Sequence, residues 1–213
     1  LPFDMSQVSI DFIDPFQGRI MSNFAFQDLK ARTASVLINT SGRYSEGLAD
    51  YFIRDFKAKG GKILFKEGYL HDTLNFSLLL EKITPLKPDV VFVPGNILDS
   101  ARIIKQARES GLMAPFLGGD GWGDSMYAHA GEALEGAFFS VHWHQDMDSN
   151  KNRQFVKEYR NFSKVPVDSG TALAYDAVFL FAHAAKRAHS VEPERVRQAL
   201  AATRDFKGIT GNI

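Results

Sequence analysis

The stretch KPDVVFVPGNILDSARIIKQARESGLMAPFLGGDGW, from Lys87 to Trp122, decides the fold class. It contains a short apolar run, a Pro-Gly-Asn turn, an amphipathic helical pattern, a second apolar run and then Gly-Gly-Asp-Gly. This order predicts a strand–helix–strand unit in which Asn96 and Asp120 follow the two strands. Ligands of open α/β sheets collect at the carboxyl ends of the strands, so we expect both side chains to face one cleft. A lone carboxylate there suits binding an ammonium group better than catalysis.

The composition excludes several classes of protein. The 213 residues contain 25 Lys and Arg against 25 Asp and Glu, so the chain lacks the positive field that nucleic acids and anionic membranes require. It contains no Cys, which excludes disulfides, thiolate catalysis and Cys-ligated metals. No stretch approaches the roughly 18 apolar residues of a membrane span. The N-terminus has neither Met nor a signal-peptide pattern, and we expect the chain to be a piece of a longer protein.

Apolar runs with strand character recur along the first two thirds of the chain. They are short and do not alternate strictly, as expected for strands buried on both faces of a parallel sheet. The predicted strands are Ala34–Asn39, Lys62–Phe65, Val90–Val93, Pro115–Gly118 and Gly136–Val141.

Helical periodicity fills the gaps between these runs. Apolar residues step by four from Tyr44 to Phe56, and Gly60 ends that helix with a residue that tolerates positive φ. A second helix, around Leu78–Ile83, has Thr73 or Asn75 available as its N-cap, and a third is closed by Gly111. Alternating strands and helices predict an α/β fold built from right-handed βαβ units.

The pattern changes after about Trp143. A polar connection, HQDMDSNKNR, is followed by three helical patterns and no convincing internal strand. The helices are expected at Phe155–Phe162, at Thr171–Ala188 and from about Pro193, a residue suited to the first turn of a helix. Because helices need a surface to cover, we expect this half to pack on a sheet that the chain only partly contains.

Several stretches, in order, resemble the type I periplasmic solute-binding proteins of ABC importers, in the branched-chain amino acid branch. The matching stretches are DPFQG (Asp14–Gly18), YSEGLADYF (Tyr44–Phe52), LNFSLLLEKI (Leu74–Ile83), KPDVVFVPG (Lys87–Gly95), IIKQARESGLMAPFLGGDGW (Ile103–Trp122), GEALEGAFF (Gly131–Phe139), AYDAVFLFAHA (Ala174–Ala184) and FKGITGNI (Phe206–Ile213). The resemblance covers nearly the whole chain.

The resemblance implies two Rossmann-like lobes that close on a ligand about a hinge. On that plan residues 1–11 end a first-lobe segment, residues 12–143 form the second α/β lobe, and residues 144–213 return to an incomplete first lobe. The first-lobe residues that hold the ligand carboxylate in the family are then missing from this sequence. With about half of the contacts gone, we expect these 213 residues to bind ligand weakly or not at all.

The resemblance also assigns candidate ligand-binding residues. Asp120 corresponds to the family's acidic partner of the ligand ammonium; the alternative is a turn Asp bonded to its own backbone. Tyr44 corresponds to a cleft aromatic; the alternative is the first residue of the helix's apolar stripe. Asn96 replaces a cleft residue of the family and has a helix cap as its alternative. Trp122 is a candidate pocket wall or plain packing, and Ser169 and Thr171 match a hinge-side contact.

Two other kinds of site are considered and set aside. His142 and His144 would share a face of a strand, but structural zinc needs four ligands and none is placed to complete the site, so no metal is predicted. The run GGDGWG (Gly118–Gly123) lacks G-x-G-x-x-G spacing and carries an acid inside the loop, where it would repel a pyrophosphate. No nucleotide or other cofactor is predicted.

Three functions remain. The first, which the resemblance implies, is a periplasmic or otherwise extracytoplasmic receptor without catalysis. It would capture a small amino acid, branched-chain or similar, in the interlobe cleft and present it to a membrane permease. The second is a ligand-sensing domain of a signalling receptor or regulator, because the same fold serves both uses. The third is an enzyme in which Asp120 and His142 or His144 form an acid–base pair, which requires them to converge within hydrogen-bond reach.

Overall fold

The computed structural model describes residues 14–213 and divides them into two compact units, one ending at Ser140 and the other beginning with Val141. The predicted boundary lay after residue 143, and the predicted segment 1–11 lies outside the described residues. In the first unit the elements are α1 (Asp14–Asn23), a π-helix (Phe24–Asp28), β1 (Thr33–Asn39), α2 (Arg43–Ala58), β2 (Lys62–Tyr69), α3 (Ser77–Ile83), β3 (Val90–Phe92), α4 (Ile97–Glu109), β4 (Phe116–Gly118), α5 (Tyr127–Ala130) and β5 (Ala137–Phe139). Short 3₁₀ turns occupy Thr84–Leu86, Asp124–Met126 and Gly131–Leu134.

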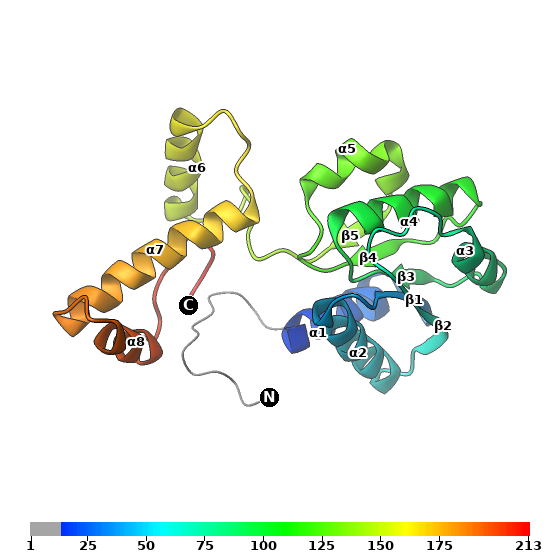
Figure 1. The fold of residues 1–213 in the computed structure, drawn as a ribbon, viewed down its shortest axis with the longest axis horizontal. Helices are drawn as coiled ribbons and strands as arrows, with labels where there is room; N and C mark the ends of the chain where they lie inside the picture. The colour runs from blue at the N-terminus through cyan, green and yellow to red at the C-terminus, as the bar shows by residue number, and fades with distance from the viewer. Residues whose placement is uncertain (1–13) are drawn as a thin grey trace. The chain divides into compact units, whose positions relative to one another are not determined.

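The five strands of this unit form one parallel sheet in the order β2-β1-β3-β4-β5. Helices α1 and α2 cover one face, and α3, α4 and α5 cover the other (Figure 1). The predicted α/β class and its parallel sheet are confirmed. All five predicted strands are present, with β2 extending four residues beyond the predicted Phe65.

Because helices bury both faces of the sheet, the strand sequences are continuous apolar runs. Val36 packs under α2 and Leu37 under α3 and α4, and both side chains are fully buried. On the α2 side, Phe52 stacks on Phe92 with ring centroids 4.1 Å apart. The sequence therefore shows no period-two alternation in β1, since neither face meets water.

In the first unit the helix ends follow the predictions, with one exception. Gly60 and Gly111 take φ values of 95° and 82° just after α2 and α4, a backbone conformation that glycine adopts at little cost. The predicted N-cap of α3 is wrong, because Phe76 occupies the cap position. The Asn75 side chain nevertheless satisfies one amide at the start of this helix, because it accepts a hydrogen bond from the Ser77 amide at 2.9 Å.

The second unit contains α6 (Asn150–Phe162), α7 (Ser169–Ala188) and α8 (Pro193–Ala201). The predicted start of α6 at Phe155 is wrong, because Ser149 caps the helix and it begins at Asn150, inside the stretch expected to be a polar connection. Its small core comprises Trp143, Phe155, Val156, Ala172 and Ile209. Asp176, buried on α7, accepts hydrogen bonds from the amides of Ile209 and Thr210 and so fixes the C-terminal segment. That segment forms one antiparallel bridge between Lys207 and Asn212.

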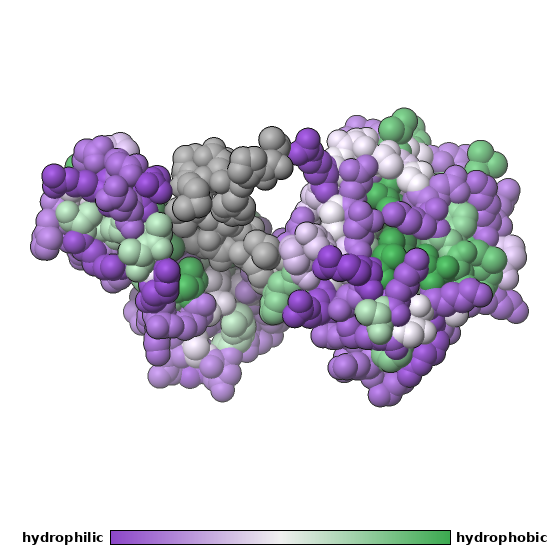
Figure 2. Space-filling model, turned by 90° about the horizontal axis from the view of Figure 1, so that it is seen from below, coloured by the Kyte–Doolittle hydropathy of each residue, from purple (hydrophilic) through white to green (hydrophobic). Residues whose placement is uncertain are grey.

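Helix α7 keeps apolar side chains in contact with solvent. Val178, Phe179 and Phe181 are 67%, 50% and 53% exposed. Figure 2 shows apolar residues interrupting the hydrophilic surface of both units. The expectation that this half packs on a further sheet remains a prediction.

Candidate functional site

Two of the predicted residues meet at the carboxyl edge of the sheet. Tyr44 lies in the first turn of α2, directly after β1, and Asp120 follows β4. The Tyr44 hydroxyl donates a hydrogen bond to Asp120 Oδ1 at 2.6 Å and accepts one from the Gly121 amide at 3.0 Å. Tyr44 therefore fixes both the carboxylate and the backbone of the loop after β4.

Burial of Tyr44, reinforced by its hydrogen bond to Asp120, raises the pKa of its hydroxyl far above the usual value. Tyr44 is thus a neutral donor, and Asp120 accepts. Asp120 itself is only half-buried, so its carboxylate borders solvent. A half-exposed carboxylate whose orientation is fixed by a neighbouring donor can bind a cationic group with little reorganisation. The ring of Tyr44 packs against the α2-side core, as its alternative interpretation predicted.

Glycines allow the loops to approach this pair closely. A Cβ at Gly121 would lie 2.7 Å from the Gly95 carbonyl oxygen, and one at Gly119 would lie 2.5 Å from the Tyr44 hydroxyl. Gln17 of α1 also lies beside Gly119, because a Cβ at Gly119 would be 2.8 Å from Gln17 Oε1. Gln17 Oε1 is buried without a hydrogen-bond partner. Gln17 was not predicted as a site residue, because no sequence pattern connects α1 with the loop after β4.

Asn96 acts as the N-cap of α4. Its Oδ1 accepts from the Asp99 amide at 2.9 Å, and its Nδ2 donates to Asp99 Oδ2 at 2.8 Å. The alternative interpretation of Asn96 as a helix cap is therefore confirmed. Its side chain turns toward Asp99 and His71, and a ligand contact from Asn96 remains only a prediction.

Asp99 is the centre of a polar network that the sequence analysis did not single out. Its buried Oδ2 accepts from Asn39 Nδ2 at 3.2 Å and lies 2.8 Å from His71 Nδ1, so it connects the ends of β1, β2 and β3. The hydrogen bond with Asp99 raises the pKa of His71. Coulombic attraction by Asp72 adds to this shift, whereas Arg102 opposes it.

His71, Asp72 and Asp99 also present ligand atoms within 4.8 Å of one another, a spacing that could hold a metal ion. Asp99 Oδ2 is already surrounded by two amide donors and the imidazole, and Arg102 Nη1 lies 3.6 Å from Asp99 Oδ1. A cation would have to displace those donors beside a guanidinium. The contacts fit a structural network better than a metal centre.

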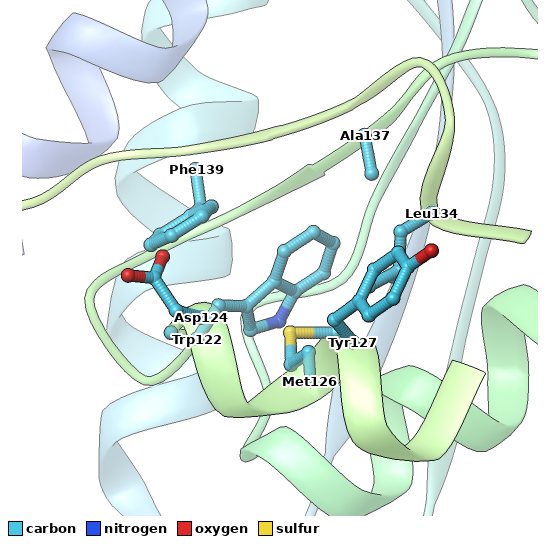
Figure 3. Close-up of a pocket in the computed structure, with 8 residues that line it drawn as sticks. Trp122, Asp124, Met126, Tyr127, Leu134, Ala137 and Phe139 are labelled. Atoms are coloured by element: carbon cyan, nitrogen blue, oxygen red, sulfur yellow. The ribbon is translucent and has the colours of Figure 1, made fainter. Parts of the chain in front are cut away.

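Trp122 lies on the opposite face of the sheet from Tyr44. The residue is 4% exposed, belongs to the core beneath α3 and α4, and lines a cavity of about 300 Å³ (Figure 3). Asp120 does not line that cavity. Trp122 therefore walls a pocket other than the one expected.

Ser169 and Thr171 begin α7 in the second unit. Asp168 caps this helix, since its Oδ1 accepts from the Thr171 amide at 2.7 Å and from the Thr171 hydroxyl at 2.6 Å. Ser169 Oγ is buried without a hydrogen-bond partner. Ligand contacts from these two residues remain predictions.

His142 and His144 lie in irregular backbone, because β5 ends at Phe139. The predicted sharing of a strand face by His142 and His144 is therefore wrong. They belong to the second unit and Asp120 to the first. Among the described residues, no helix combines the length and apolar character needed to cross a membrane.

The family model for periplasmic binding proteins matches residues 17–213. The chain belongs to this family. It is 28% identical over 202 residues to the leucine-, isoleucine-, valine-, threonine- and alanine-binding protein of Pseudomonas aeruginosa, covering 94% of this chain and 53% of that protein. The chain thus spans about half the length of the curated relatives that it matches.

Solved structures of related proteins also resemble this chain in fold and sequence. The leucine-binding protein LivK of Thermotoga maritima superposes with a TM-score of 0.90 and 33% identity, over 95% of this chain and 58% of that one. LivJ of Streptococcus pneumoniae, a branched-chain amino acid transporter substrate-binding protein in complex with isoleucine, gives a TM-score of 0.87 and 31% identity, over 94% and 57%. The predicted resemblance is confirmed.

Proposed function

We propose that this chain belongs to the extracytoplasmic solute-binding component of an ABC importer and helps to capture a small aliphatic amino acid, branched-chain or similar. Membership of the periplasmic binding protein family supports a binding role without catalysis. The names of its relatives support the ligand class and the delivery of that ligand to a membrane permease. Residues 12–143 would then represent the second lobe and residues 144–213 part of the first.

The observation that carries the proposal is the carboxylate of Asp120, held by the Tyr44 hydroxyl at the carboxyl edge of the sheet. An ammonium group that bonds to it would gain about 1.5–3 kcal/mol from a charge-assisted hydrogen bond. Gly119 and Gly121 keep side-chain bulk away from this position, as the close contacts at both glycines show. The site is thus suited to the ammonium end of a zwitterion.

The proposal is tested with two ligands that differ only in the ammonium group: L-isoleucine and 3-methylpentanoate. The amides of Gly119 and Gly121 are followed in the ¹⁵N-labelled protein at millimolar ligand, a range chosen because weak binding is expected. L-Isoleucine should shift these amides, and 3-methylpentanoate should not.

The matched variant is Asp120→Asn, which keeps the shape of the side chain and removes its charge. We expect it to weaken binding of L-isoleucine roughly 10- to 100-fold, which corresponds to the free energy of one charge-assisted hydrogen bond. Equal shifts with both compounds, or unchanged affinity in the variant, would exclude Asp120 as the ammonium partner.

A further inference from the structure

The cavity beside Trp122 lies within the first unit, on the side of the sheet covered by α4 and α5. The loop and short helices after β4 line it together with β5, through Trp122, Gly123, Asp124, Met126, Tyr127, Leu134, Ala137 and Phe139. Its volume of about 300 Å³ is at the lower end of the range for small-molecule sites. Tyr127 is 64% exposed and Asp124 is also exposed, so both lie where the cavity meets solvent.

Apart from Asp124 and Tyr127 at the solvent side, the side chains that line this cavity are apolar except for one donor. The ring of Trp122 is tilted by 45° against that of Phe139, with centroids 6.3 Å apart. Its Nε1 is buried and has no hydrogen-bond partner. In Figure 3 this nitrogen is on the edge of the ring beside Met126, another lining residue.

A buried N–H without an acceptor destabilises the state that contains it, because the group has given up its bond to water. The indole N–H of Trp143 shows the usual outcome in the second unit, where it donates to Asn152 Oδ1 at 2.6 Å. The contrast between these two buried indoles singles out the Trp122 N–H as a donor that no protein group satisfies.

We propose that the Trp122 cavity is a second binding site, which takes a compact aromatic or branched apolar molecule with one carbonyl oxygen that accepts from the indole N–H. The apolar walls supply contact area, and the indole N–H selects for the acceptor. The site is separate from the Tyr44–Asp120 pair, because Trp122 and Tyr44 pack into the cores on opposite faces of the sheet. It does not depend on the proposed function.

The probes are acetophenone and ethylbenzene, which have similar shapes and differ in the carbonyl. The ¹⁵N-labelled chain gives one indole N–H signal for each of Trp122 and Trp143. We expect acetophenone to move the Trp122 signal downfield and to bind roughly five- to tenfold more tightly than ethylbenzene, the weight of one neutral hydrogen bond. The Trp143 signal, whose donor is already paired, should not move.

Two variants keep the test decisive. Trp122→Phe removes the donor and should abolish the preference for acetophenone. If that variant does not fold, Ala137→Leu serves instead: it fills the cavity while keeping the indole, and should block both probes. An unmoved Trp122 signal, equal affinities for the two probes in the unaltered chain, or retained binding in Ala137→Leu would each overturn the proposal.

Discussion

Replacing Tyr44 by Phe removes a single oxygen atom from the centre of the candidate site. The substitution keeps the ring and its packing against the α2-side core. It removes the 2.6 Å hydrogen bond to Asp120 and leaves the Gly121 amide without the Tyr44 hydroxyl as its acceptor. Tyr44→Phe therefore measures how strongly the hydroxyl holds the loop after β4.

The expected cost follows from the environment of each group. A hydrogen bond to a charged group contributes about 1.5–3 kcal/mol. Tyr44, Asp120 and Gly121 are only half-buried, so water can replace part of what each loses. We therefore expect the free energy of unfolding of the first unit to fall by about 1.5–2 kcal/mol, near the lower limit of that range.

The two tryptophans allow each unit to be followed separately. Trp122 reports on the first unit and Trp143 on the second, so urea unfolding of the 5-fluorotryptophan-labelled chain by ¹⁹F NMR gives one transition for each. Only the Trp122 transition should move in Tyr44→Phe. Tyr127→Phe is the matched control, because that side chain is largely exposed and its loss of a hydroxyl should change stability by no more than about 0.5 kcal/mol.

A double-mutant cycle with Asp120→Ala isolates the pair. We expect a coupling energy of about 1.5 kcal/mol between the two side chains. A coupling below about 0.5 kcal/mol would show that the hydroxyl does not anchor the carboxylate, and the reasoning that Asp120 is pre-oriented would fail.

Three further predictions concern other parts of the chain. Gly121→Ala should destabilise the first unit by about 1–3 kcal/mol through overpacking against the Gly95 carbonyl, whereas Gly123→Ala, with open space around it, should be nearly neutral in the same urea experiment. Asp176→Ala should destabilise the second unit by about 2–4 kcal/mol, because the amides of Ile209 and Thr210 lose their acceptor. Asp148→Ala, which changes a 95% exposed side chain, should leave the stability unchanged. The Trp143 transition measures both variants. The pKa of His71, measured by NMR, should lie above the ordinary value of about 6.5 and return toward it in Asp99→Asn. The His71–Asp99 pair should therefore stabilise the folded chain below about pH 6.5. That stabilisation should be lost as the pH rises through the folded-state pKa.

The candidate site was only partly predictable from the sequence. Asp120 and Tyr44 were singled out separately, on strand-end position and family resemblance, but their direct hydrogen bond was not foreseen. Asn96 was correctly predicted to follow a strand. The prediction that it faces the same cleft as Asp120 did not consider that its side-chain amide donates a hydrogen bond to Asp99. His71 and Gln17 were missed altogether, because nothing near either residue in sequence marks its contacts.

What the sequence determined by itself is the α/β class, the positions of the strands and most helix ends. These follow from local properties: apolar runs, helical spacing and glycines that tolerate positive φ. Tertiary structure alone decided that Tyr44 meets Asp120 across 76 positions of sequence, that Asn39 meets Asp99 across 60, and that Trp122 turns to the opposite face of the sheet. The physical reason is that such contacts depend on strand order and register, which bring residues together irrespective of their distance along the chain.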